Sequence, residues 1–170
     1  MIPRVVQVCR DINAHWQVRA IPGVELTHIP PELIPPLTLQ ARTWGAQIVL
    51  VHGETIVEPV PPGTNRRAVA AGVDILAHPG FITEEEVIEA REKGVFLEIT
   101  ARKGHSLTNG HVARLAQKVG ASLIFNTDAH APDDLILRDS ALKIAQGAGL
   151  TQEDFERMLE NARKLSEHRN

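Results

Sequence analysis

Residue types that commonly bind metal ions recur where short apolar segments of this sequence end. Glu25 closes Pro-Gly-Val-Glu, His52 closes Ile-Val-Leu-Val-His, His78 follows Ile-Leu-Ala, and Asp128 and His130 follow Ile-Phe-Asn-Thr. Mixed carboxylate and imidazole ligands suit zinc, manganese or iron better than calcium. Each residue taken singly has an ordinary structural explanation, such as a hydrogen-bonded core histidine or a turn cap. Together, the five predict a centre for divalent metal ions.

A second group of residues could hold an anion. Arg102, Lys103 and His105 lie on one loop, and a helical segment begins shortly after them, near Asn109. Guanidinium, ammonium and free helix N–H groups all favour a phosphate, and His105 could contact the substrate or donate a proton. The alternative is a solvated basic loop. We therefore expect Arg102, Lys103 and His105 to be the catalytic and substrate-binding residues if the loop faces the metal centre.

Two further residues are weaker candidates for the same region. His28 follows Glu25 closely enough to reach the metal centre, and Glu98 ends the strand segment that lies between those of His78 and Asp128. Both would need the fold to bring them inward.

The elements that must position these residues alternate between apolar β-rich segments and helical patterns. Such alternation predicts a parallel sheet, in which the carboxyl ends of the strands meet at one edge. We expect Thr83 and Glu86 to form a capping box, Asn109 to cap its helix, and glycines 45, 72, 94 and 120 to end helices. The expected strands are Val18 to Leu26, Gln47 to Val51, Val73 to Ala77, Val95 to Ile99 and Ser122 to Asn126. The expected helices are residues 1 to 15, Pro31 to Trp44, Asn65 to Ala71, Thr83 to Lys93, Asn109 to Val119, Asp134 to Gln146 and Gln152 to Glu167.

Length and composition fit one globular domain over residues 1–170. The chain has 170 residues, of which 43% are hydrophobic, and a formal net charge of −3. That charge is not the basic footprint of a dedicated nucleic-acid binder. Cys9 is the single cysteine, so no intrachain disulfide or cysteine-pair zinc site can form, and a reducing cytoplasmic location fits. No apolar run approaches the roughly 18 residues of a membrane span.

At these residues the sequence resembles the PHP (polymerase and histidinol phosphatase) family. The stretch from Ile21 to Asp133 is similar to histidinol-phosphatase-like members, through Gly-Val-Glu, His-Pro-Gly and Asp-Ala-His. The resemblance implies a distorted (β/α)7 TIM-like barrel with up to three metal ions. It also implies that Glu25 bridges two ions, that His52 and His78 complete one site, and that Asp128 and His130 belong to a second and a third.

The sequence departs from that family at its beginning. Members open with a His-x-His strand, a Ser-Asp-Gly segment and a second strand ending near Thr-Asp-His, and this sequence has none of these. We therefore expect an incomplete barrel of about five parallel strands, in an N-terminally truncated PHP-type domain that is open at its edges and prone to self-association. A misplaced gene start, a fragment and a natural degenerate form are the three explanations, in that order.

The function that follows from these expectations is metal-dependent hydrolysis by a metal-activated water. A small phosphomonoester is the expected substrate, because the Arg-Lys loop offers a phosphate site; histidinol phosphate, nucleotides and sugar phosphates all remain open. Two alternatives stand beside this phosphatase. One is an amidohydrolase-like metallohydrolase, and the other is a catalytically silent binding domain. No membrane or nucleic-acid partner is expected.

Overall fold

The computed structural model describes residues 1–168 of the chain. Within them the chain forms five parallel strands in one sheet of order β1-β2-β3-β4-β5, with seven α-helices. The strands are β1 (Gly23–Leu26), β2 (Ile48–His52), β3 (Ile75–Ala77), β4 (Phe96–Thr100) and β5 (Leu123–Asn126). The helices are α1 (Ile2–Asn13), α2 (Ile34–Thr43), α3 (Thr64–Ala70), α4 (Glu84–Lys93), α5 (Asn109–Val119), α6 (Arg138–Gly147) and α7 (Gln152–His168). The predicted alternation of strands and helices is confirmed.

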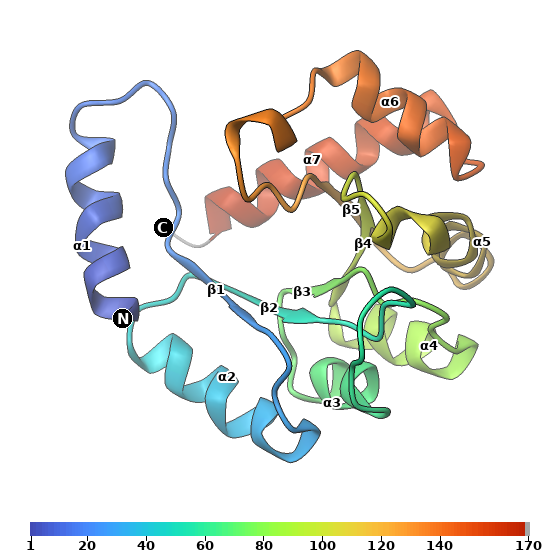
Figure 1. Ribbon diagram of the computed structural model, residues 1–170, viewed down its shortest axis with the longest axis horizontal. Helices are drawn as coiled ribbons and strands as arrows, with labels where there is room; N and C mark the ends of the chain where they lie inside the picture. Colours follow the sequence, from blue (N-terminus) through green and yellow to red (C-terminus); the bar gives the residue numbers. More distant parts are fainter. Residues whose placement is uncertain (169–170) are drawn as a thin grey trace.

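The fold is an α/β arrangement, an incomplete TIM-like barrel whose sheet is not closed. Helices α2 to α5 follow one another around the outer face of the curved sheet (Figure 1). The core lies between these helices and the strands, where Leu76, Leu97 and Ile99 are fully buried. Each strand joins the next through a helix, so the strands run parallel and their carboxyl ends lie at one edge.

Local sequence signals set several helix ends as predicted. At the start of α4, Oγ1 of Thr83 accepts a hydrogen bond from the Glu86 backbone N–H, and the Glu86 side chain accepts one from the Thr83 backbone N–H. The glycines that follow α2, α3, α4 and α5 all have positive φ, at 96°, 63°, 68° and 78°. A left-handed residue there satisfies helix carbonyls and turns the chain toward the next strand.

A buried ion pair ties α2 to the middle of the sheet. Asp74 precedes β3 and is buried; its Oδ2 accepts hydrogen bonds from the Val49 backbone N–H at 2.7 Å and from Nη1 of Arg42 at 3.0 Å. The carboxylate therefore joins β2, the start of β3 and the end of α2.

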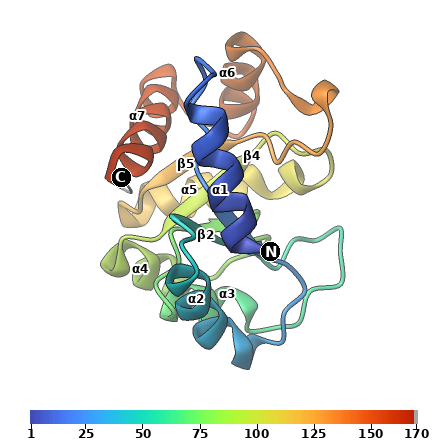
Figure 2. The same ribbon diagram turned by 90° about the vertical axis from the view of Figure 1, so that its left-hand side faces the viewer.

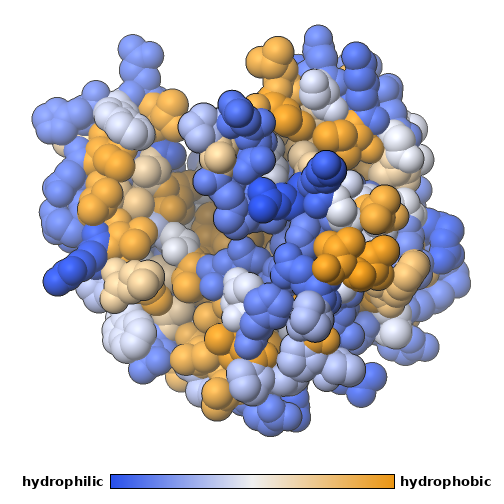
Figure 3. Space-filling view, viewed as in Figure 1, coloured by the Kyte–Doolittle hydropathy of each residue, from blue (hydrophilic) through white to orange (hydrophobic). Residues whose placement is uncertain are grey.

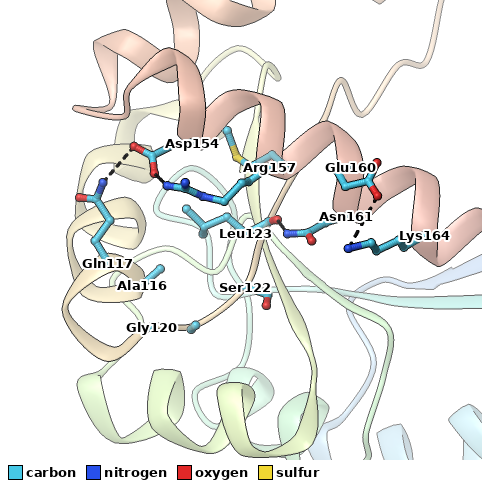
Figure 4. Close-up of a pocket in the computed structure, with 12 residues that line it drawn as sticks. Ala116, Gln117, Gly120, Ser122, Leu123, Asp154, Arg157, Glu160, Asn161 and Lys164 are labelled. Carbon is cyan, nitrogen blue, oxygen red and sulfur yellow. Dashed lines mark hydrogen bonds and ion pairs between the residues drawn. The ribbon is translucent and has the colours of Figure 1, made fainter.

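The two edges of the open sheet differ. Helix α7 runs along β5, and the side-chain amide of Asn161 donates a hydrogen bond to the Leu123 carbonyl at 2.8 Å (Figure 4). Within α7, the charges beside this contact are paired between Asp154 and Arg157 and between Lys164 and Glu160. Helix α1 stands apart from the strands, on the β1 side of the molecule (Figures 1 and 2). The β5 edge is covered, and within residues 1–168 β1 pairs with β2 alone.

The inner face of the sheet is open to a hollow between α1 and the rest of the molecule (Figure 3). A cleft of about 350 Å³ lies on this face and includes apolar side chains from β2 and β3, among them Ile48, Leu50 and Ile75. Leu165 of α7 belongs to one small buried cluster with Ile75 and Ile124. In a closed barrel this apolar surface would be interior.

Three expectations about elements were wrong. The first strand begins at Gly23 instead of Val18, because Val18 is 73% exposed, the backbone of Ala20 bonds the side chain of Asn13, and Pro22 has no N–H for a strand ladder. Asn109 does not cap α5; its buried side chain bonds both backbone groups of Thr100. Helix α6 starts at Arg138, because residues 132–134 form a separate 3-10 turn.

None of the helices within residues 1–168 combines the length and the apolar character needed to cross a bilayer.

Candidate metal centre

Glu25, His52 and His78 converge at the carboxyl ends of the first three strands. The parallel register places Leu26 beside Val51 and His52 beside Ala77, so the three side chains become neighbours. Nδ1 of His52 lies 2.6 Å from Nε2 of His78 and 3.5 Å from Oε1 of Glu25. One ligand atom from each of the three residues falls within 4.8 Å of the others. These residues could hold one metal ion, as the sequence predicted for them.

Glu98, in β4, orients the ring of His78. Oε2 of Glu98 lies 2.9 Å from Nδ1 of His78 and accepts the His78 backbone N–H at 2.8 Å. Oε1 of Glu98 accepts a hydrogen bond from the side-chain amide of Asn126 at 2.9 Å. Because the carboxylate only accepts, Nδ1 of His78 carries the proton and the lone pair of Nε2 faces His52 and Glu25. Carboxylate–histidine pairs of this kind support metal-binding histidines.

The backbone is strained at three of the candidate residues. Among residues 1–168, the non-glycine residues with positive φ are His28 (53°), His78 (29°) and Asp128 (48°). Each such conformation costs on the order of 1–3 kcal/mol and persists only when the surroundings enforce it. All three residues follow strand ends. A positive φ there gives the side chain a direction that it would not have in a regular strand.

The electrostatics of the cluster favour opposite charges on its members. Burial opposes ionisation of Glu25, but its hydrogen bond with His52 and the charge of His78 outweigh burial and lower the pKa of the carboxyl. Burial likewise opposes protonation of His78, but the hydrogen bond and charge of Glu98 raise its pKa. A cation in place of the shared protons would satisfy the same carboxylates.

Asp128 and His130 lie further from the three converging ligands. Asp128 lines the same cleft as Glu25 and His78, and burial, followed by the charge of Glu25, raises its pKa. His130 has a 64% exposed side chain, with Nδ1 at 3.6 Å from Oδ1 of Asp128. The structure thus brings Asp128 into the cleft beside the ligands, whereas His130 stands at its outer rim.

The basic loop faces acidic partners. Nη1 of Arg102 lies 3.2 Å from Oδ2 of Asp134, and Nε of Arg102 lies 3.8 Å from Oδ2 of Asp128. Lys103 is exposed beside them, in a groove that also contains Asp133. The charge of Arg102 is therefore partly offset before any substrate binds.

His105 lies inside the cluster, at the start of the 3-10 turn His105–Thr108. It is buried, with its ring centroid 4.3 Å from that of His78 and 5.7 Å from that of His52. Its Nδ1 lies 2.8 Å from Oγ1 of Thr55. Burial, followed by the charge of His78, lowers its pKa.

Sequence reasoning missed Glu58, in the proline-rich loop after β2. Its carboxylate lies 3.1 Å from Nε2 of His28, 3.2 Å from Nε2 of His52 and 3.3 Å from Nε2 of His105. Burial opposes its ionisation, but the charges of His52 and His105 and the hydrogen bond of His28 lower its pKa. The available signal was an acidic residue directly before Pro59, in the loop that follows His52.

Comparisons with known proteins give one strong and several weaker likenesses. No protein-family model matches the sequence. The uncharacterized protein MJ1295 of Methanocaldococcus jannaschii is 47% identical over 161 residues, which cover 94% of this chain and 74% of that protein. A probable phosphatase of Thermoanaerobacter sp. is 32% identical over 92 residues, 48% of this chain. The chain spans only 38% of the length of that phosphatase.

Two solved structures share the fold. A chain in a cryo-EM structure of archaeal ribonuclease P with mature tRNA superposes with a TM-score of 0.77 at 18% identity, over 99% of this chain and 77% of that one. A crystal structure of an amidohydrolase superposes with a TM-score of 0.56 at 17% identity, over 84% of this chain and 41% of the other. At these identities the likeness concerns the fold alone.

Proposed function

This chain belongs to the same family as the uncharacterized protein MJ1295 of Methanocaldococcus jannaschii, and we propose that it is a metal-dependent hydrolase that cleaves a small phosphomonoester within a single PHP-type domain. The observation that carries the proposal is the convergence of Glu25, His52 and His78, with Glu98 fixing the ring of His78. The partial identity to probable phosphatases supports the reaction class.

In this proposal Glu25, His52 and His78 hold a zinc, manganese or iron ion, and Asp128 and His130 contribute at the rim of the cleft. The donor set fits, because two imidazole nitrogens and a carboxylate oxygen already face one another. A divalent ion bound there would lower the pKa of a bound water molecule and would offset the negative charge of a phosphate. Glu98 keeps the Nε2 lone pair of His78 directed at the ion.

Arg102, Lys103 and His105 contact the substrate in the same proposal. Asp134 and Asp128 hold the guanidinium of Arg102 at the edge of the cleft, where a phosphate could replace one carboxylate as its partner. The lowered pKa of His105 keeps its ring mainly neutral near pH 7, so it holds no extra proton to donate. We therefore assign His105 to substrate contact and not to proton donation.

The test combines metal analysis with an assay for hydrolysis of a chromogenic phosphomonoester. The wild-type chain and His78→Ala are compared, with His15→Ala, an exposed histidine outside the cluster, as the matched control. We expect wild type and His15→Ala to bind zinc or manganese and to turn over the ester, and His78→Ala to lose turnover and the metal ion held with Glu25 and His52. Metal content that His78→Ala leaves unchanged would contradict the proposal.

A second candidate is an amidohydrolase-like metallohydrolase. The observation that favours it is the ion pair between Arg102 and Asp134. Because of this pair, the guanidinium of Arg102 is already neutralised and is less available to a phosphate. Turnover of amide substrates in place of phosphomonoesters by the metal-loaded chain would select this candidate. Metal binding without either turnover would favour a catalytically silent binding domain.

A further inference from the structure

A second cluster of side chains meets His52 through its other ring nitrogen. We propose that His28, His52 and Glu58 form a second metal position beside the first, with His105 next to it. This proposal rests on the proposed function, because the two positions share His52.

The ligand atoms of this second position already face one another. One ligand atom from each of His28, His52 and Glu58 lies within 4.8 Å of the other two. One oxygen of Glu58, Oε2, is 3.1 Å from His28 and 3.2 Å from His52. Two imidazoles and one carboxylate make the same donor set as the first position, and such sets suit zinc.

The contact between His52 and Glu58 is close but is not a hydrogen bond. The His52 side chain is 6% exposed. Among residues 1–168, its Nε2 is the buried side-chain nitrogen with no hydrogen-bond partner, although Oε2 of Glu58 is close. The two atoms are therefore near but misaligned. A buried ring nitrogen left without a hydrogen bond costs about 1–3 kcal/mol, and a bound cation would use its lone pair.

The loop that carries Glu58 is held at both ends. After β2, the Glu54 backbone N–H donates to Oδ1 of Asn65, and Oε1 of Glu54 accepts the backbone N–H groups of Gly63 and Asn65. Close to Glu58, Thr55 bonds Nδ1 of His105 and leaves Nε2 of His105 facing the Glu58 carboxylate. These contacts close residues 54–65 into a fixed loop that places Glu58 over the strand ends.

Sharing His52 has a chemical consequence. Nδ1 of His52 faces Glu25 and His78, whereas Nε2 faces Glu58. A neutral imidazole has one lone pair and one N–H. Occupation of both positions therefore requires His52 to lose its remaining N–H proton to the solvent and to bridge the two ions as an imidazolate.

The experiment measures zinc stoichiometry and proton release on the full chain. Zinc content is determined after equilibrium dialysis, and titration calorimetry at pH 8 in buffers of different ionisation enthalpy counts released protons. The variants are Glu58→Gln, Glu25→Gln and Glu32→Gln, the last a control at an exposed glutamate outside both positions. Circular dichroism checks that each variant is folded.

We expect two zinc ions per chain for wild type and Glu32→Gln, and one for Glu58→Gln and for Glu25→Gln. Full loading of wild type should release about one proton more than loading of Glu58→Gln, because only wild type deprotonates both nitrogens of His52. One zinc ion in wild type, retained in Glu58→Gln and lost in Glu25→Gln, would overturn the second position and leave the proposed function standing. A wild-type chain that binds no zinc would overturn both.

Discussion

Glu98 accepts two hydrogen bonds from His78 through one oxygen, from the ring Nδ1 at 2.9 Å and from the backbone N–H at 2.8 Å. Both residues are buried, and His78 has a positive φ of 29°. A single carboxylate thus fixes both the ring and the unusual backbone of a proposed metal ligand.

The charge of Glu98 should set metal affinity. Glu98→Gln keeps the shape of the side chain but removes the charge that favours the ring of His78 as a ligand. We expect zinc affinity at the first position to fall by roughly 10- to 100-fold, as for other partners of metal-binding histidines. Competition titration with a chelating dye measures the change. Glu89→Gln, on the outer helix α4, should leave the affinity unaltered.

Arg102→Ala should weaken substrate binding without changing zinc content at the first position. A charge-assisted hydrogen bond contributes about 1.5–3 kcal/mol, so we expect KM for a phosphomonoester to rise by at least about tenfold. Steady-state kinetics with metal analysis of the same sample checks this. Arg66→Ala, an exposed cation on α3, is the control. Equal KM values in Arg102→Ala and wild type would assign Arg102 to its ion pairs with Asp134 and Asp128.

Asp74→Ala should be severely destabilising. The substitution leaves the Val49 N–H without its acceptor and Arg42 without its buried partner. Breaking a buried charge pair typically costs about 3–5 kcal/mol. Urea denaturation measures the free energy of unfolding. Asp11→Ala, on the exposed face of α1, should change it by no more than about 0.5 kcal/mol.

Alanine substitutions at two glycines with the same φ allow the cost of backbone strain to be separated from the cost of a steric clash. Gly72 and Gly80 both have a φ of 63°, but a Cβ on Gly80 would lie 1.8 Å from the Glu54 carbonyl oxygen, whereas one on Gly72 meets nothing within 4 Å. Gly72→Ala should therefore cost only the strain, on the order of 1–2 kcal/mol.

We expect Gly80→Ala to cost more and to displace the loop of Glu58. Thermal unfolding and zinc stoichiometry of the two variants provide the comparison. Equal melting temperatures would show that the loop accommodates the added methyl group.

Acid should remove a stabilising carboxylate contact at the start of α7. The backbone N–H of Thr151, followed by its hydroxyl and Arg157, lowers the pKa of Asp154 below its ordinary value. A carboxyl with a lower pKa in the folded state stabilises the fold above its unfolded pKa of about 3.9, and this contribution is lost as the pH falls through the folded value. We expect Asp154→Asn to be less stable than wild type at pH 7, with the difference shrinking below about pH 4. Unfolding curves from pH 7 to pH 2 test this.

Sequence patterns predicted the five strands and the convergence of Glu25, His52 and His78, because each of these residues lies at or next to the carboxyl end of an apolar segment. The parallel register then brings Glu25, His52 and His78 together without further information. Glu58 could not be found in this way, since its position depends on a loop whose path is set by Glu54 and Asn65.

The environment of Arg102 was missed for a related reason. Its partner Asp134 lies in a separate 3-10 turn that the sequence suggested was the start of a helix. Long-range side-chain pairs of this kind leave no periodic pattern in the sequence. The same holds for the contact between Nδ1 of His105 and Oγ1 of Thr55, which joins residues that lie far apart in the sequence.

The placement of α7 makes the two edges of the sheet unequal for the addition of a further strand. Since Asn161 occupies the Leu123 carbonyl, a further strand could join β5 only by first displacing the helix. On the β1 side, strand addition needs no such displacement, because β1 pairs with β2 alone within residues 1–168. A strand that enlarges this sheet without displacing α7, from whatever polypeptide, would therefore pair with β1, next to Glu25. Lengthening the sheet would then also change the surroundings of the candidate metal centre.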